Sequence, residues 1–324
     1  MDALLVGSRA LRYWFPNSRN PKDDYDLFVT QSGLKKLNKL REHCLNVKYA
    51  GDDIINYYLK IGTSISIDND RYKSVRMFLD LNSGSPNIDL FGLECKVATP
   101  ETLMSIKRSH LYYRHNWYKH IKDYHYLKGK NVEITSKMQD ALFEREKERA
   151  LREKSQKRVD LSKSNQDFFS KSDKAVRRKF KHDDLHLAIA YYERPLYERL
   201  KEDLSRASVK KELFMKLDFI DKCRLVAEEA SVIGLERLII PQWHNVYQLS
   251  EFGVSQRKIH AEDYKELAGK AYRYAVMRIC TDLTKGWFRD FAIDNYIMIM
   301  NIKPNYVEKW LSAFERGDLK LCET

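Results

Sequence analysis

The stretch Leu4–Val29, "LLVGSRALRYWFPNSRNPKDDYDLFV", contains two apolar runs separated by a polar segment. The first run ends at Gly7-Ser8, and the second opens with Asp24 and Asp26. This pattern predicts two short buried strands, "ALLVGS" and "YDLFVT", joined by a polar connection. Residues two apart in a strand point to the same face, so we expect the Asp24 and Asp26 carboxylates to project side by side. A surface hairpin and a site for a metal ion and a polyphosphate both fit this pattern.

The metal-site interpretation rests on the chemistry of the two carboxylates. Carboxylates held this close repel each other unless a cation lies between them. Mg²⁺ is the usual cation, bound through one or two carboxylates and substrate phosphate oxygens. Gly7 permits a tight turn with exposed backbone N–H groups, and Ser8 adds a hydroxyl. We therefore expect Gly7 and Ser8 to cradle the outer phosphates of a nucleoside triphosphate.

The remaining residues up to 130 alternate between strand-like and helix-like segments. An amphipathic helix capped by Ser32 is predicted over 32–44. We expect strands over 56–67 and 74–82, and a further strand or hairpin over 87–98. Thr99 as cap, with Pro100 at the first helical position, predicts a helix that runs to residue 129 with at most one break. The fold class predicted for residues 1–130 is an α/β (α+β) domain with a mixed sheet.

The ordered set of Gly7-Ser8, Asp24-x-Asp26 and a third acid on a later strand resembles the nucleotidyltransferase superfamily that includes DNA polymerase β. The pairing of "GSRA" with "DDYDLFV" resembles a small branch found in microbial and phage proteins. The resemblance covers roughly residues 4–125. It implies that Asp24 and Asp26 bind two Mg²⁺ (or Mn²⁺) ions and that a third carboxylate activates the attacking hydroxyl. The implied reaction transfers a nucleoside monophosphate from a nucleoside triphosphate and expels pyrophosphate.

Two positions compete for the third carboxylate. Asp80 in "FLDLN" and Asp89 in "NIDLF" both have the apolar-Asp-apolar form. Asp89 is preferred because a capped helix follows it closely, as is common in the family, and Asp80 is the substitute candidate. The spacing from Gly7 to Asp24 is longer than usual for the family, which implies an enlarged loop.

Basic residues that could contact the phosphates lie in two places. The enlarged loop carries Arg9, Arg12, Arg19 and Lys22. The helix after Pro100 carries Lys107, His110 and Lys119, of which Lys107 and His110 are the main nucleotide-binding candidates. Four histidines recur at intervals of five, at 110, 115, 120 and 125, and cannot share one face of a continuous helix, so we expect no metal cluster there.

Other interpretations remain open. Asp89, Glu94 and Lys96 match a D…ExK nuclease signature, in which acids bind Mg²⁺ and the lysine positions water. His182 and His186 are four apart and form a possible metal pair. A catalytically inactive member of the fold that only binds nucleic acid would share the basic residues.

The charge distribution bears on the partner and on the domains. The net charge of +12 divides into +7 for 1–130, +6 for 131–182 and −1 for 183–324. We predict a catalytic domain over 1–130, a basic helical or flexible arm over 131–182 in which "ALFEREKERALREKSQKR" is a solvated helix, and an all-helical domain over 183–324. The basic part favours RNA, tRNA or DNA as acceptor, although a protein side chain or a small molecule also fits, and the oligomeric state is not readable.

Composition excludes several other classes of protein. No apolar run approaches the roughly 20 residues of a membrane span, and the N-terminus lacks the pattern of a secretory signal. The five cysteines are widely spaced without a CxxC, which indicates reduced thiols. We therefore expect a cytoplasmic protein with no membrane partner.

Overall fold

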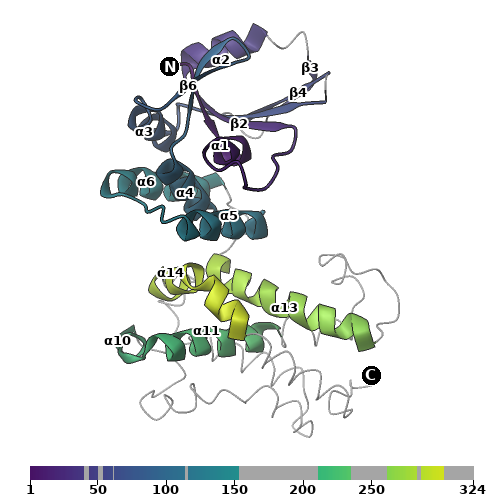
Figure 1. Ribbon diagram of the computed structural model, residues 1–324, viewed down its shortest axis with the longest axis vertical. Coiled ribbons are helices and arrows are strands. Elements are labelled where there is room, and N and C mark those ends of the chain that lie inside the picture. Colours follow the sequence, from purple (N-terminus) through teal and green to yellow (C-terminus); the bar gives the residue numbers. More distant parts are fainter. Residues whose placement is uncertain are drawn as a thin grey trace, which may run out of the picture. The chain divides into compact units, whose positions relative to one another are not determined.

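A computed structural model describes residues 1–39, 44–49, 54–60, 62–113, 116–152, 211–234, 261–282 and 286–302. The chain divides into two compact units, Met1–Gln156 and Lys157–Thr324. The first unit contains a sheet with helices, and the described part of the second is helical (Figure 1). This confirms the coarse prediction of an α/β part followed by a mostly helical part.

The N-terminal unit is built on a seven-stranded mixed sheet in the order β3-β4-β5-β2-β1-β7-β6. Its strands are β1 (Ala3–Val6), β2 (Asp24–Val29), β3 (Cys44–Tyr49), β4 (Ile54–Leu59), β5 (Ser64–Asn69), β6 (Asn87–Leu90) and β7 (Leu93–Val97). Strand β1 is antiparallel to β2, the middle strand of the sheet, and parallel to β7, while β2 is parallel to β5. The two strands predicted from the opening stretch are therefore neighbours.

Side chains of β2 alternate between two helical layers. Val29 faces α2 (Gln31–Leu37), where a β-carbon on Gly33 would come within 2.9 Å of the Val29 side chain. On the other face, Phe28 stacks on Phe78 of α3 (Lys73–Leu81). Asp24 and Asp26 share the Phe28 face, since they lie four and two residues before it. Figure 1 shows α4, α5 and α6 gathered on one side of the sheet and α2 on the other.

The helix predicted after Pro100 forms as two helices. Thr99 caps α4 (Pro100–His110) by accepting a hydrogen bond from the Thr102 backbone N–H. The predicted single break then separates α4 from α5 (Trp117–Gly129). This break allows residues ten apart to meet, which a continuous helix would forbid.

Four local predictions were wrong. The single strand predicted over 56–67 forms two strands, β4 and β5. The polar connection begins as a helix, α1 (Gly7–Trp14), rather than as an open loop. Thr30, not Ser32, caps α2. The segment over 74–82 is helical because its buried residues recur at helical spacing, at Ser74, Val75, Phe78 and Leu79.

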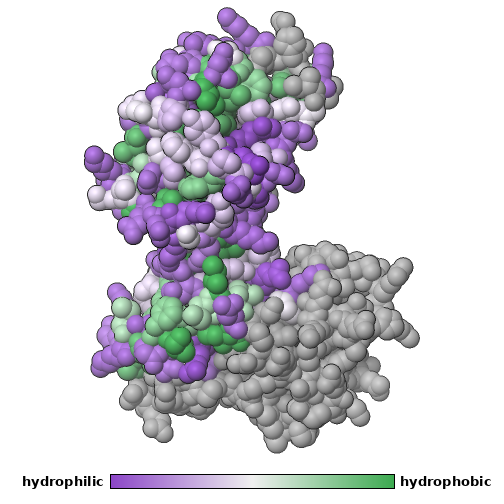
Figure 2. Space-filling model, in the orientation of Figure 1, coloured by the Kyte–Doolittle hydropathy of each residue, from purple (hydrophilic) through white to green (hydrophobic). Residues whose placement is uncertain are grey.

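The charge-rich helix α6 (Ser136–Arg152) is not a solvated arm. It packs against α3 and α4 and buries Met138, Ala141, Leu142 and Arg145. Ser74 at the start of α3 donates its backbone N–H to Glu148 of α6 at 2.9 Å. This helix therefore belongs to the N-terminal unit, and the rest of the predicted arm lies outside the described residues. Figure 2 shows mostly hydrophilic side chains over the visible face of this unit.

The described part of the C-terminal unit includes four helices and an aromatic cluster. The helices are α10 (Lys211–Lys216), α11 (Phe219–Gly234), α13 (Ala261–Asp282) and α14 (Gly286–Asp294). Phe214 packs against Trp287, Phe288 and Phe291 of α14. Tyr272 donates a hydrogen bond to the Ile299 carbonyl at 3.1 Å and so fixes α13 against the chain that follows α14.

Candidate functional site

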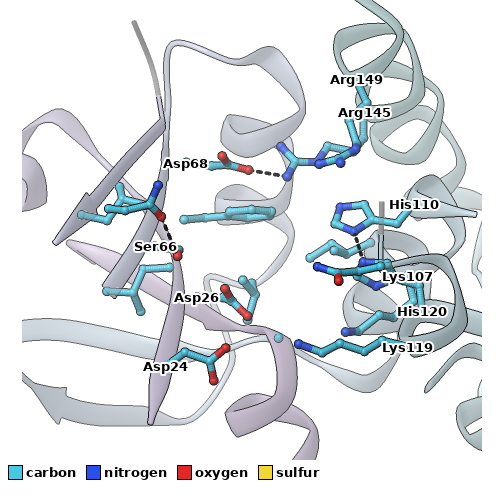
Figure 3. Close-up of a pocket in the computed structure, with 18 residues that line it drawn as sticks. Asp24, Asp26, Ser66, Asp68, Lys107, His110, Lys119, His120, Arg145 and Arg149 are labelled. Carbon is cyan, nitrogen blue, oxygen red and sulfur yellow. Dashed lines mark hydrogen bonds and ion pairs between the residues drawn. The ribbon is translucent and has the colours of Figure 1, made fainter. Parts of the chain in front are cut away.

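A pocket of about 370 Å³ lies between the β2–β5 face of the sheet and helices α4, α5 and α6. Its sheet side carries three carboxylates, Asp24, Asp26 and Asp68 (Figure 3). Its helical side carries four cationic side chains and two histidines, namely Lys107, Lys119, Arg145, Arg149, His110 and His120. The pocket therefore has an acidic wall and a basic wall that face each other.

The acidic wall comes from two adjacent parallel strands. Asp26 pairs in register with Ser66 of β5, and Phe28 pairs with Asp68. Asp68 lies two residues beyond Ser66 along β5, so its side chain is on the same face of the sheet as that of Asp26. The pKa of Asp26 is raised, first by burial and then by the negative charges of Asp24 and Asp68, while Lys107 and Lys119 act in the opposite direction.

Gly7 lies in close contact with the Asp26 carboxylate. It begins α1 with a φ of +72°, a conformation that favours glycine. A β-carbon at this position would come within 2.1 Å of Asp26 Oδ2. Gly7 therefore allows Asp26 to lie against the first turn of α1, where the helix dipole favours negative charge.

One carboxylate oxygen of the acidic wall has no protein partner. Asp24 Oδ1 is buried and accepts no hydrogen bond. A buried carboxylate oxygen is normally paired, so this oxygen is suited to a cation. Among the described residues, however, no group of three or more His, Cys, Asp or Glu side chains is arranged to hold a metal ion. The residues therefore fit a cation held by Asp24 and Asp26 and completed by a substrate.

Asp68 is held by a cation from α6. Arg145 Nη2 forms an ion pair with Asp68 Oδ2, and the same guanidinium lies 4.9 Å from the centroid of the Phe28 ring. Neither residue was singled out from the sequence. The alternation of "SISID" could have indicated that Ser66 and Asp68 share a face, whereas nothing in the Lys/Glu/Arg-rich α6 sequence distinguishes Arg145 from its neighbours.

Lys107 is fixed by a buried ion-pair network behind the pocket wall. Its Nζ lies 2.8 Å from Asp123 Oδ2, and Arg19 also binds Asp123 through Nε at 2.8 Å and Nη2 at 3.0 Å. Burial opposes ionisation of Asp123, but the Arg19 hydrogen bond and Lys107 hold its pKa below the usual value. Lys119 is not the partner that its spacing from Asp123 suggests. Its pKa is lowered by burial and by the nearby charges of Lys107 and Arg19.

His110 and His120 form a direct pair across the break between α4 and α5. His110 Nδ1 and His120 Nε2 are 3.0 Å apart, and the rings meet edge to face. Burial, followed by surrounding positive charges, lowers the pKa of His110 and brings that of His120 to about 2. Both rings are therefore neutral at physiological pH. The sequence argument considered these histidines on a continuous helix, and the break between α4 and α5 is what brings this pair together.

The structure places the other predicted residues away from the pocket lining. Ser8 is buried in α1, and Arg9 donates its Nε to the Asp24 carbonyl at 2.9 Å, so it positions β2. Arg12 binds the Ser18 carbonyl. Asp80 is exposed on α3, and Asp89 is exposed on β6 at the far edge of the sheet. Neither candidate for the third carboxylate lines the pocket, whereas Gly7, Asp24, Asp26, Lys107 and His110 do.

The residues of the nuclease signature are also outside the pocket. Asp89 and Glu94 oppose each other in the β6–β7 hairpin, and Glu94 lies 3.5 Å from the N-terminal amine. Lys96 donates its Nζ to the Ser85 carbonyl at 2.9 Å. His182 and His186 lie outside the described residues.

Comparison with known proteins places the chain in one family. A family model described as a domain of unknown function, DUF7275, matches residues 102–310, and the chain belongs to this family. The match includes α4, α5 and α6, which carry the basic wall of the pocket. No curated protein and no solved structure matches the chain. None of the described helices is long and apolar enough to cross a membrane.

Proposed function

We propose that this chain is a Mg²⁺-dependent nucleotidyltransferase that transfers a nucleoside monophosphate from a nucleoside triphosphate to an acceptor. The observation that carries the proposal is the pairing of Asp24 and Asp26, with one unpartnered buried oxygen, opposite a wall of cationic side chains. A nucleoside triphosphate with a divalent cation matches this arrangement, because the cation suits the carboxylates and the phosphates suit the lysines and arginines.

Asp24 and Asp26 would hold the metal, and Gly7 leaves the space in which the Asp26 carboxylate lies. Bound Mg²⁺ would supply neutralisation of the phosphate charge at the reacting phosphorus. Lys107 is fixed by Asp123, so its charge is positioned before a substrate arrives. Lys119 projects into the pocket from α5 and would donate to phosphate oxygens (Figure 3).

In the proposed reaction, an acceptor hydroxyl oxygen forms a bond to the α-phosphorus. The bond from that phosphorus to the bridging oxygen breaks, and pyrophosphate leaves with its electron pair. A carboxylate of the acidic wall takes the hydroxyl proton, and Asp68 is the carboxylate of that wall to which no metal-holding role is assigned.

The acceptor that we propose is nucleic acid. Residues 1–130 and 131–182 carry net charges of +7 and +6, whereas the remainder is close to neutral. An excess of positive charge of this kind in the chain favours a polyanionic acceptor and raises its association rate. A protein side chain is the competing acceptor, and it would be labelled even when no nucleic acid is added.

The test is transfer of label from each α-³²P-labelled nucleoside triphosphate in the presence of Mg²⁺, with tRNA, with DNA, and with no added acceptor. We expect label on nucleic acid, and we expect Asp24→Asn and Asp26→Asn to abolish it. Asp23→Asn is the matched control, since Asp23 precedes both residues along the chain but its side chain is 86% exposed. Labelling that survives both active-site changes would show that the site is wrongly assigned. Salt-sensitive nucleic-acid binding without transfer would identify an inactive binding module instead.

A further inference from the structure

Arg145 is a buried cation with unfilled hydrogen-bonding capacity. Its side chain is only 3% exposed. Nη2 contacts Asp68, but Nε and Nη1 are buried and have no hydrogen-bond partner. The guanidinium also packs over the Phe28 ring, so it is held in place on one face. Two donors of a fixed, always-charged group are therefore left beside the pocket.

These unfilled donors indicate a missing anion. A buried donor without a partner is destabilising, and more so when the group is charged. After burial, the nearby positive charges of Arg149, Arg145 and Lys107 also lower the pKa of His110, so this end of the pocket is electropositive. An anion in the pocket would satisfy the donors and reduce this excess of positive charge.

The histidine pair supplies a further donor toward the same space. Only one proton can lie between His110 Nδ1 and His120 Nε2, and the outer nitrogens, His110 Nε2 and His120 Nδ1, are buried without partners. Two neutral rings therefore leave one outer nitrogen as a donor and the other as an acceptor. If His120 donates to His110, then His110 Nε2 carries the free proton. Figure 3 shows His110 and Arg145 on the same side of the pocket, facing the sheet.

We propose that Arg145 and His110 form a phosphate-binding subsite, in which Arg145 Nε and Nη1 and the His110 Nε2–H donate to the oxygens of one phosphate group. A guanidinium matches the spacing of phosphate oxygens, and a fully ionised phosphate group only accepts hydrogen bonds, which selects the tautomer with hydrogen on His110 Nε2. A neutral histidine is a fitting third donor because it adds no charge beside Arg145. The ligand class is a phosphate group of a polyphosphate.

The subsite deepens the proposed function, and only its assignment to a nucleotide rests on that function. Asp24 and Asp26 mark the metal end of the pocket, and Arg145 reaches Asp68 from α6 on the opposite wall. In a bound nucleoside triphosphate, the subsite takes one phosphate group of the polyphosphate chain. The same donors would bind free pyrophosphate, so its binding can be measured without any transfer reaction.

The test is calorimetric titration of the full chain with pyrophosphate, tripolyphosphate and orthophosphate in EDTA. We expect Arg145→Gln to weaken pyrophosphate binding by at least about tenfold, since charge-assisted hydrogen bonds contribute about 1.5–3 kcal/mol each. Lys147→Gln is the matched control, because Lys147 lies on the same helix but is 52% exposed, and it should change binding less than twofold. Arg145→Lys keeps the positive charge but lacks the planar guanidinium. If Arg145→Gln does not fold, this variant should fold and keep only part of the wild-type affinity for pyrophosphate.

A second readout separates binding from a structural role. In ¹⁵N spectra of labelled histidines, pyrophosphate should stabilise the His110 Nε2–H tautomer and shift its resonance without protonating the ring. Equal pyrophosphate affinity in wild type and Arg145→Gln, with both folded, would overturn the subsite. Tight binding of orthophosphate alone, with no gain for the longer anions, would also overturn the polyphosphate assignment. Arg145-dependent pyrophosphate binding without any nucleotidyl transfer would uphold the subsite and refute the proposed function.

Discussion

The backbone of Gly7 lies directly against the carboxylate of Asp26, which occupies the space that a β-carbon on residue 7 would need. The β-carbon of any other residue would come within 2.1 Å of Asp26 Oδ2, while the φ of +72° already disfavours non-glycine residues. The two sequence features at the ends of the opening stretch therefore depend on each other. Gly7 makes room for the Asp26 carboxylate. The sequence had predicted only that Gly7 permits a tight turn.

Gly7→Ala should displace the Asp26 carboxylate and remove the proposed activity. A misplacement of about 1 Å at a reacting centre costs about a hundredfold in rate, and the backbone strain costs a further ~1–3 kcal/mol in stability. Gly92→Ala is the matched control, because Gly92 has a φ of +70° but a β-carbon there would meet nothing within 4 Å. Label transfer and the thermal midpoint should be measured for both variants. Equal losses of transfer in the two would contradict the role assigned to the Gly7–Asp26 contact.

Asp68, rather than Asp89 or Asp80, should be the third carboxylate of the proposed reaction. Asp68 lines the pocket from the strand next to Asp26, whereas Asp89 and Asp80 are exposed outside it. Asp68→Asn should lower the rate of label transfer by about 10²–10⁴-fold, the usual effect of losing a general base. Asp89→Asn and Asp80→Asn should stay within about twofold of wild type. Loss of transfer in Asp89→Asn would restore the prediction made from the sequence.

The contrast between these aspartates shows what the sequence could reveal. The proximity of Asp24 and Asp26 was predictable because their spacing, their strand and the preceding Gly7-Ser8 are all local features of the sequence. The α4 helix was predictable for the same reason, since Thr99 and Pro100 are local signals. Asp68 was missed because its place in the pocket depends on the parallel pairing of β5 with β2, a contact between strands about 40 residues apart that the alternation of "SISID" alone does not reveal.

Two further features required the tertiary structure. Arg145 is one of many charged residues in α6, and only the packing of that helix on α3 and α4 buries it. The segment over 74–82 has the sequence pattern of a strand because its apolar residues also alternate, and the packing of Phe78 on Phe28 favours the helix. In both cases a tertiary contact decided between two local possibilities.

Asp123→Ala should strongly destabilise the N-terminal unit. Asp123 is 3% exposed and neutralises Lys107, which is also buried, so its removal leaves an uncompensated buried charge. Breaking a buried pair in this way costs about 3–5 kcal/mol. The unfolding midpoint and hydrogen exchange of the α4 and α5 amides should both report the loss. Lys107→Met should reduce the cost of Asp123→Ala, because the unpaired ammonium is then absent.

The control for this network is an ion pair at the surface. Glu144→Ala removes the partner of the exposed Lys73 and Lys147 side chains and should leave the midpoint unchanged. If Glu144→Ala and Asp123→Ala had the same effect, the buried network would have no special role in holding the basic wall of the pocket.

Acid should destabilise the N-terminal unit through His120. Burial, together with Lys107, Arg149 and Lys119, lowers the pKa of this histidine to about 2, against only Asp123 acting to raise it. Its pKa in the unfolded chain is about 6.5, so below that pH the unfolded state binds a proton that the folded state does not. The unfolding free energy should therefore fall as the pH drops below about 6.5, by up to about 1.4 kcal/mol per pH unit for this group.

His120→Gln, whose amide can still donate to His110 Nδ1, should show a shallower slope between about pH 6 and 4. The measurement is denaturant unfolding at stepped pH, with the histidine resonances followed in parallel. A His120 ring that titrates near its ordinary pKa in the folded protein would contradict the neutral pair on which the pocket wall depends.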